Sequence, residues 1–170
     1  MRDPDIRNAL IPTIQYSGRI LQEVCVNRSV ADIIVVSDFL HGYEIKSEYD
    51  SLSRLQHQSR CYAHVCSYMT AVVAPRHVDG VKKLPNTWGI MTVDRCGLYE
   101  VRKPVENTDL CFVSLLYLLT KQEVLGILER RGLMRRGIKS LPRYELHPLI
   151  EGMLPIEEWR KEVCFSLYNR

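Results

Sequence analysis

The chain has 170 residues, of which 46% are hydrophobic and 25% are charged, and its formal net charge is +3. This length suffices for one well-buried domain but is too short for two comfortable ones, and so mild a charge does not by itself indicate nucleic-acid binding. No apolar run approaches the roughly 18 residues of a membrane span, which argues against a membrane protein.

The N-terminal segment MRDPDIRNAL has acids where a secretory signal peptide needs a basic start and an apolar core. Six cysteines are scattered along the chain with no C-x-x-C pair and no metal-site spacing. Most of them lie in apolar runs, where a free cysteine behaves as a small buried hydrophobe. We therefore expect a reduced, cytoplasmic protein.

Hydrophobic periodicity divides the chain near residue 106 into a strand-rich half and a helical half. Strand patterns cover 19–26, 30–37, 43–48, 70–74, 87–92 and 98–102. Helical patterns cover 3–11, 51–69, 109–132 with a break near Thr120, and 155–170, whereas 133–147 is basic and loop-like. We expect an α/β domain with a mixed sheet of about five strands flanked by helices, followed by a helical C-terminal extension.

The most informative stretch is VADIIVVSDFLHGYEIKSEY, residues 30–49. Asp32 interrupts an apolar run in which an unpaired carboxylate would be costly to bury. Residues 38–42 are short enough for a hairpin, which would pair the flanking strands antiparallel and bring Asp32 close to Glu44. Glu44 and Lys46 project from one face of the second strand because side chains alternate. Two carboxylates and an ammonium are what a metal-dependent phosphodiesterase needs.

The helix predicted after this hairpin places Gln58 and Tyr62 on its buried side, one turn apart. A buried amide needs a hydrogen-bond partner, and the acids of the sheet would be its neighbours. His57, Cys61 and His64 fall on the opposite side, for which we expect solvent exposure.

In these features the sequence resembles the PD-(D/E)XK, or restriction-endonuclease-like, nucleases, and specifically the RecB-like branch with a Q-x-x-x-Y motif. The matching block is Gly42-Tyr43-Glu44-Ile45-Lys46-Ser47, then Asp50, Arg54-Leu55 and Gln58. The resemblance covers roughly residues 1–105 and implies a restriction-endonuclease-like core over 1–106. The helical extension would then span 107–170 and pack on the same domain.

The resemblance implies a metal site that holds Mg²⁺ or Mn²⁺. Asp32 and Glu44 would be its carboxylate ligands, and the backbone carbonyl of Ile45 would complete the set. Glu23 matches a further acid that precedes the first motif in such enzymes. The alternative for Glu23 is an outward-facing residue on an edge strand. A hard cation of this kind prefers carboxylate, carbonyl and water oxygens.

The resemblance also implies roles for three other side chains. Lys46 would orient or deprotonate the attacking water, or stabilise the charged phosphorane. Gln58 and Tyr62 would support the site and contact the nucleic-acid backbone. Ala31 stands where the family usually has proline, a departure that removes no ligand.

The segment ERRGLMRRGIKSLPR, residues 129–143, is the best candidate for phosphate contacts, provided that it folds beside the cleft. Its cations are Arg130, Arg131, Arg135, Arg136, Lys139 and Arg143. The alternative is a solvated helix end, where cations also complement the helix dipole.

We therefore expect a Mg²⁺-dependent nuclease that cleaves DNA. The alternatives are a catalytically silent nuclease-fold module that binds nucleic acid or a protein partner, and a purely structural Lys–Glu pair beside a hydrogen-bonded Asp32. The apolar stretch 110–128 offers a surface for a homodimer.

Overall fold

The computed structural model describes residues 1–170 and centres on one six-stranded sheet with strand order β1-β2-β3-β4-β5-β6. The strands are β1 (Arg19–Val26), β2 (Ser29–Val36), β3 (Leu40–Lys46), β4 (Tyr68–Val73), β5 (Trp88–Asp94) and β6 (Gly97–Arg102). β3, β4 and β5 run parallel, and the other neighbours pair antiparallel. The α/β class, the mixed sheet and the antiparallel hairpin of β2 and β3 are thus confirmed.

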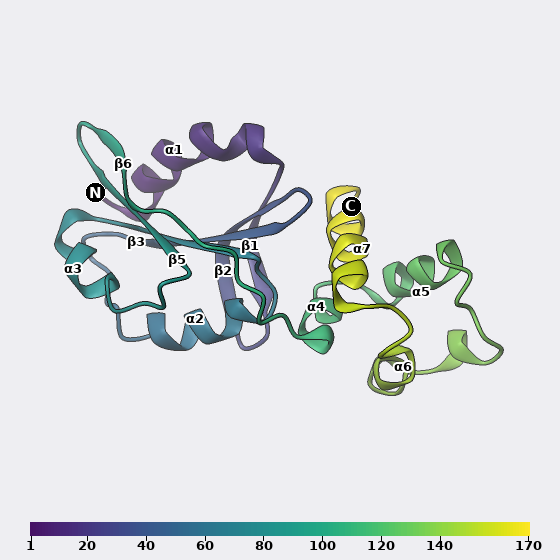
Figure 1. The fold of residues 1–170 in the computed structure, drawn as a ribbon. Helices are drawn as coiled ribbons and strands as arrows, with labels where there is room; N and C mark the ends of the chain where they lie inside the picture. Colours follow the sequence, from purple (N-terminus) through teal and green to yellow (C-terminus); the bar gives the residue numbers. More distant parts are fainter.

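Helices cover both faces of this sheet (Figure 1). They are α1 (Asp3–Ile14), α2 (Leu55–Ala63), α3 (Val78–Val81), α4 (Phe112–Tyr117), α5 (Lys121–Arg130), α6 (Arg143–Ile150) and α7 (Ile156–Tyr168). Short 3₁₀ turns lie at Gln15–Ser17, Pro75–His77 and Ile138–Ser140. α1 packs on one face and α2 on the other, so the sheet is the middle of three layers.

Both faces of the central strands are apolar because both are covered. On the α1 face, Ile6 and Leu10 are fully buried against a set that includes Ile33 and Ile45. Burying a side chain of this size contributes about 1.5–3 kcal/mol, so this short helix is anchored mainly by its apolar stripe. The α2 face belongs to a larger core that continues into the C-terminal helices.

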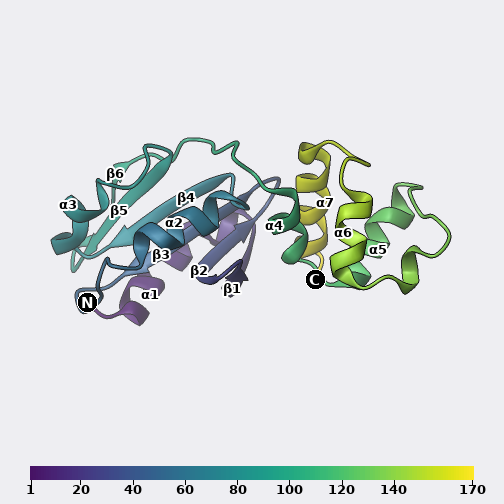
Figure 2. The same ribbon diagram turned by 90° about the horizontal axis from the view of Figure 1, so that it is seen from below.

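The helices α4 to α7 form an extension at one end of the sheet (Figure 2). The guanidinium of Arg160 on α7 donates to the Asp38 carbonyl at 2.6 Å and lies over the Phe39 ring, with its central carbon 4.3 Å from the ring centroid. The predicted break near Thr120 is the N-cap of α5, and Gly132 after α5 has a φ of 66°, a left-handed value that suits glycine.

Three predicted boundaries are wrong. The second strand of the hairpin, predicted over 43–48, is β3 and begins at Leu40, so the turn is shorter than the predicted 38–42. The helix predicted over 51–69 is only α2, because its end is set by a distant segment. Asn107 Nδ2 donates to the carbonyls of Ala63 and Cys66, and the Cys111 N–H donates to the His64 carbonyl. These partners satisfy the free carbonyls at the helix end and let β4 begin at Tyr68.

The segment 133–147 is not simply a loop, because α6 begins within it. Pro142 supplies the N-cap residue of α6, and Leu146 and Ile150 are fully buried in the core of the extension. This burial depends on contacts with the other helices, so the local sequence does not reveal it.

The apolar stretch 110–128 packs within the chain rather than forming an open dimer surface. Its buried members are Leu115, Leu116, Leu118, Leu119, Val124, Ile127 and Leu128. A homodimer stays a prediction, but this set is not available to form it. None of the helices is both long and apolar enough to cross a membrane.

Candidate active site

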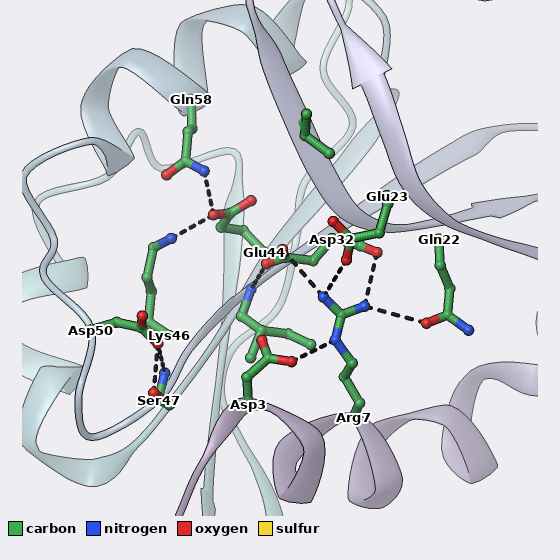
Figure 3. Close-up of polar contacts among 12 residues, drawn as sticks. Asp3, Arg7, Gln22, Glu23, Asp32, Glu44, Lys46, Ser47, Asp50 and Gln58 are labelled. Carbon is green, nitrogen blue, oxygen red and sulfur yellow. Dashed lines mark hydrogen bonds and ion pairs between the residues drawn. The ribbon is translucent and has the colours of Figure 1, made fainter.

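The first acid lies where two strands separate. The β2–β3 ladder runs from Val36 opposite Leu40 to Ile33 opposite Tyr43, and Asp32 follows directly. Its Oδ2 accepts the backbone N–H of Ile45 at 2.6 Å, in place of a strand partner (Figure 3). Burial, and then the charge of Glu44, raise the pKa of Asp32 to about 7. The two acids are therefore close enough to repel each other, as the hairpin predicted.

The second acid is the buried centre of the site. Glu44 is 1% exposed, and its Oε1 accepts from Lys46 Nζ at 2.6 Å and from Gln58 Nε2 at 2.5 Å (Figure 3). Its Oε2 lies 2.7 Å from the Tyr62 hydroxyl. The four polar residues predicted from β3 and α2 thus meet at one carboxylate. The charge-assisted contacts fix its orientation.

This carboxylate is not fully satisfied. The Tyr62 hydroxyl has one proton but two acceptors at 2.7 Å, namely Glu44 Oε2 and the Val30 carbonyl. Gln58 Oε1 is buried and has no hydrogen-bond partner. These oxygen atoms together have too few hydrogen-bond donors. A hard divalent cation and its bound waters would satisfy them, because such a cation binds oxygen ligands and its waters donate hydrogen bonds.

Arg7 on α1 belongs to the site, although the sequence analysis did not single it out. Its guanidinium donates to Asp3 Oδ1 and Glu23 Oε1, each at 2.6 Å. It also donates to the Asp32 carbonyl at 3.2 Å, to Asp32 Oδ1 at 3.4 Å and to Gln22 Oε1 at 3.3 Å (Figure 3). The i,i+4 spacing of Asp3 and Arg7 was readable as a helical ion pair, whereas the contacts to β1 and β2 depend on how α1 docks.

Glu23 lies at the rim of the site, where its carboxylate pairs with Arg7. Its side chain is 62% exposed. Its backbone φ is 51°, in the left-handed region that non-glycine residues seldom occupy. It sits between the pairs Gln22–Ile33 and Val24–Ala31, so the β1–β2 ladder is interrupted beside Asp32. Strain of this kind persists where the surroundings impose it and is concentrated at functional sites.

A cavity of about 400 Å³ opens over these groups. Its lining includes Asp32, Glu44, Ile45, Lys46, Gln58 and Glu23. No set of three or more His, Cys, Asp or Glu side chains is arranged to hold a metal. Two carboxylates and a backbone carbonyl nevertheless fit Mg²⁺, which keeps several waters and commonly takes only one or two protein carboxylates.

The solvent exposure predicted for His57, Cys61 and His64 is confirmed only in part. His57 and His64 are exposed as expected, but Cys61 is buried. Cys61 joins the larger core, so α2 is covered over more of its surface than its apolar stripe alone indicated. All six cysteines are free thiols.

The basic segment does not lie beside the cleft. None of its six cations lines the cavity, and they belong to the helical extension (Figure 2). Arg130 and Arg131 pair with Glu162 at 2.7 and 2.6 Å, and Lys139 pairs with Glu129 at 2.8 Å. Arg143 donates to the Leu116 carbonyl at 2.9 Å and lies over Tyr117. Only Arg135 and Arg136 of this set are exposed without a partner in the chain.

The fold is similar to that of a protein of known structure. The chain resembles the SPO1766 protein of unknown function from Silicibacter pomeroyi, with a TM-score of 0.50, 17% identity, and coverage of 82% of this chain and 94% of that one. At this identity the likeness concerns the fold alone.

Sequence comparison gives a more definite relationship. Protein cII of Enterobacteria phage P4 is 25% identical over 187 aligned positions, which cover 100% of this chain and 68% of that protein. The family model described as bacteriophage P4 protein cII matches residues 3–167, nearly the whole chain. The chain therefore belongs to the bacteriophage P4 protein cII family.

Proposed function

We propose that this protein is a Mg²⁺- or Mn²⁺-dependent nuclease that hydrolyses phosphodiester bonds of DNA, built on a restriction-endonuclease-like core. The observation that carries the proposal is the convergence of Asp32, Glu44 and Lys46 in one cavity, with Gln58 and Tyr62 bound to the same Glu44. Each residue alone has an ordinary structural explanation. Their meeting at one buried carboxylate supports a built site, because burying these polar groups together carries a desolvation cost.

Each residue of the site has its own role in the proposed hydrolysis. Asp32 and Glu44, with the Ile45 carbonyl, would hold the cation. A bound Mg²⁺ supplies Lewis-acid polarisation of the phosphoryl oxygen and a lowered pKa for its water. Lys46 keeps Glu44 oriented and places a positive charge where the pentavalent phosphate gains negative charge.

Gln58 and Tyr62 act on Glu44 through their donor groups. The Gln58 amide donates to Oε1 and the Tyr62 hydroxyl faces Oε2, so both carboxylate oxygens are oriented from α2. Fixing a metal ligand in this way is typical of the residues behind a metal site.

A second candidate is a silent module with the same fold, which binds nucleic acid or a protein partner without cutting it. The observation that favours it is charge pairing within the chain. Lys46 already neutralises Glu44, and Arg7 already contacts Asp32. A site whose acids are paired in this way can persist for structural reasons alone.

A cleavage panel separates the two. The protein is incubated with single- and double-stranded DNA and RNA, with Mg²⁺, with Mn²⁺ and with a chelator. We expect metal-dependent cleavage of DNA that Glu44→Gln and Lys46→Ala abolish. The exposed residues Glu100 and Lys83 provide matched controls, Glu100→Gln and Lys83→Ala, which should cleave like the wild type.

Cleavage that survives Glu44→Gln would reveal a contaminating nuclease and overturn the proposal. Absence of cleavage from every substrate, combined with equal nucleic-acid binding in metal and in chelator, would instead establish the silent module.

A further inference from the structure

The cavity over Glu44 has two chemically different walls. On the side of α1 and β1 its lining is acidic, with Asp3 and Glu23 beside Asp32. On the side of α2 and the β1–β2 turn it carries Arg54 and Arg28. Asp50, just before α2, also lines the cavity, but its carboxylate accepts from the N–H and hydroxyl of Ser47. The acidic wall suits a cation, and the basic wall has no use in the function proposed so far.

The two arginines come from elements that are tied together. Asn27 Nδ2, in the β1–β2 turn, donates to the Cys61 carbonyl of α2 at 3.2 Å. The Tyr62 hydroxyl of α2 donates to the Val30 carbonyl just after that turn, at 2.7 Å. The backbone on both sides of Arg28 is therefore held beside α2.

Both arginines are unused within the chain. Arg28 and Arg54 are exposed, and neither side chain forms an ion pair or a hydrogen bond with another residue. The other two cations near the acids differ, since Lys46 is bound to Glu44 and Arg7 to Glu23 and Asp3. Guanidinium groups that line a polar cavity and have no carboxylate partner are suited to bidentate phosphate binding.

The start of α2 adds to this wall. Arg54 is its N-cap residue, and no side chain caps the first turn, so no side chain offsets the partial positive charge of the helix end. His57 lies in the next turn and also lines the cavity. Phosphate groups bind at such helix ends through free backbone N–H groups.

A buried polar atom without a partner indicates that a ligand completes this region. Gln58 is 8% exposed, lines the same cavity, and leaves its Oε1 without a donor. A phosphate oxygen cannot fill that need, because it is itself an acceptor. The sugar, base or bound water of a nucleotide can, so the expected ligand carries phosphate and donors together.

We infer that Arg28, Arg54 and the N-terminus of α2 form a clamp for one backbone phosphate of a nucleic-acid strand, next to the phosphate that would be cleaved at Glu44. Its place beside the scissile phosphate rests on the proposed function, whereas its affinity for a phosphodiester strand does not. This clamp takes the role that the sequence had suggested for the basic segment of the extension.

Oligonucleotide binding in chelator tests the clamp without cleavage. A labelled single strand is titrated with the full-length wild type and with Arg28→Gln, Arg54→Gln and the double variant, at several salt concentrations. Each single substitution should weaken binding several-fold. The double variant should also reduce the slope of log affinity against log salt by about 0.7, since the one phosphate contact is then lost. Arg54→Lys should bind more tightly than Arg54→Gln, because it keeps the charge.

The matched control is Arg135→Gln with Arg136→Gln, which removes two exposed, unpaired arginines from the extension. We expect that variant to bind like the wild type. Wild-type binding that is undetectable, or that is lost in this control but kept in the Arg28/Arg54 double variant, overturns the clamp.

The outcome is separable from that of the proposed function. If the wild type cleaves DNA and the double variant does so with unchanged KM, the clamp is wrong and the nuclease stands. If the arginines bind the strand and no metal produces cleavage, the clamp stands and the nuclease is wrong.

Discussion

The backbone N–H of Ile45 donates its hydrogen bond to the Asp32 carboxylate, 2.6 Å away, at the point where β2 and β3 stop pairing. The carboxylate takes the place of a strand carbonyl, which leaves its other oxygen, Oδ1, with a long 3.4 Å contact to Arg7. Because the Asp32 carboxylate replaces a backbone carbonyl as the acceptor, the β2–β3 pairing ends beside Glu44 and an acid lies at the point where it ends.

Metal affinity should depend on pH through Asp32. Burial and the charge of Glu44 raise the pKa of Asp32 to about 7, so below that pH a proton competes with the cation. We expect Mg²⁺ or Mn²⁺ affinity to rise about tenfold per pH unit up to pH 7 and to level off above it. Calorimetry between pH 5.5 and about 8.5 measures this, and Asp32→Asn should bind more weakly with no such slope. A flat profile in the wild type would contradict the assignment.

Arg7 should be a positioning residue for the acids of β1 and β2. Arg7→Lys keeps the charge but loses the fork that reaches Asp3, Glu23 and Asp32 together. In a titration of Mg²⁺ binding, we expect the Mg²⁺ concentration at half-saturation to rise about 10- to 100-fold. This is the usual effect of removing a group that orients a metal ligand.

The control for this substitution is Arg60→Lys on α2, where the arginine is exposed and has no partner in the chain. A purely structural role for Arg7 would lower stability but leave the metal dependence of the folded protein unchanged.

Tyr62→Phe should destabilise the fold and weaken the site. The change removes the only proton available to the Val30 carbonyl and Glu44 Oε2 from this side chain, each 2.7 Å from the hydroxyl. Leaving buried acceptors without a donor costs about 1–3 kcal/mol, measurable by denaturant unfolding. Tyr68→Phe is the control, because the Tyr68 hydroxyl has no hydrogen bond in the chain and its loss should change stability by less than about 0.5 kcal/mol.

His41 should make the fold sensitive to acid. Its ring lies between Thr70 Oγ1 at 2.9 Å and the Tyr43 hydroxyl at 3.2 Å, and burial lowers its pKa to about 4. Below the ordinary histidine pKa of 6.5, His41 is protonated in the unfolded chain but stays neutral in the folded chain. Stability should therefore be fully present above pH 6.5 and decline as the pH falls toward 4, by at most about 1.4 kcal/mol per pH unit.

Denaturant unfolding of the wild type and of His41→Gln between pH 4 and about 7.5 isolates this contribution. The difference in stability between the two should shrink as the pH falls. His64→Gln, at an exposed position on the end of α2, should follow the wild-type curve.

Local patterns in the sequence determined the strands, the hairpin and the buried side of α2. Apolar runs of strand length located every strand of the sheet, and the short turn predicted after the second strand indicated the antiparallel hairpin. The helical period placed Gln58 and Tyr62 on the side of α2 that faces Glu44. These features follow from the geometry of a single element or of two neighbouring ones.

Tertiary structure decided what depends on distant segments. It ended α2 at Ala63 through Asn107, brought Arg7 across from α1, and put the paired arginines of the extension away from the cavity while Arg28 and Arg54 line it. Spacing along the chain determines which side of its own helix or strand a residue occupies. Which elements then face one another is settled by sheet order and core packing, which no local period encodes.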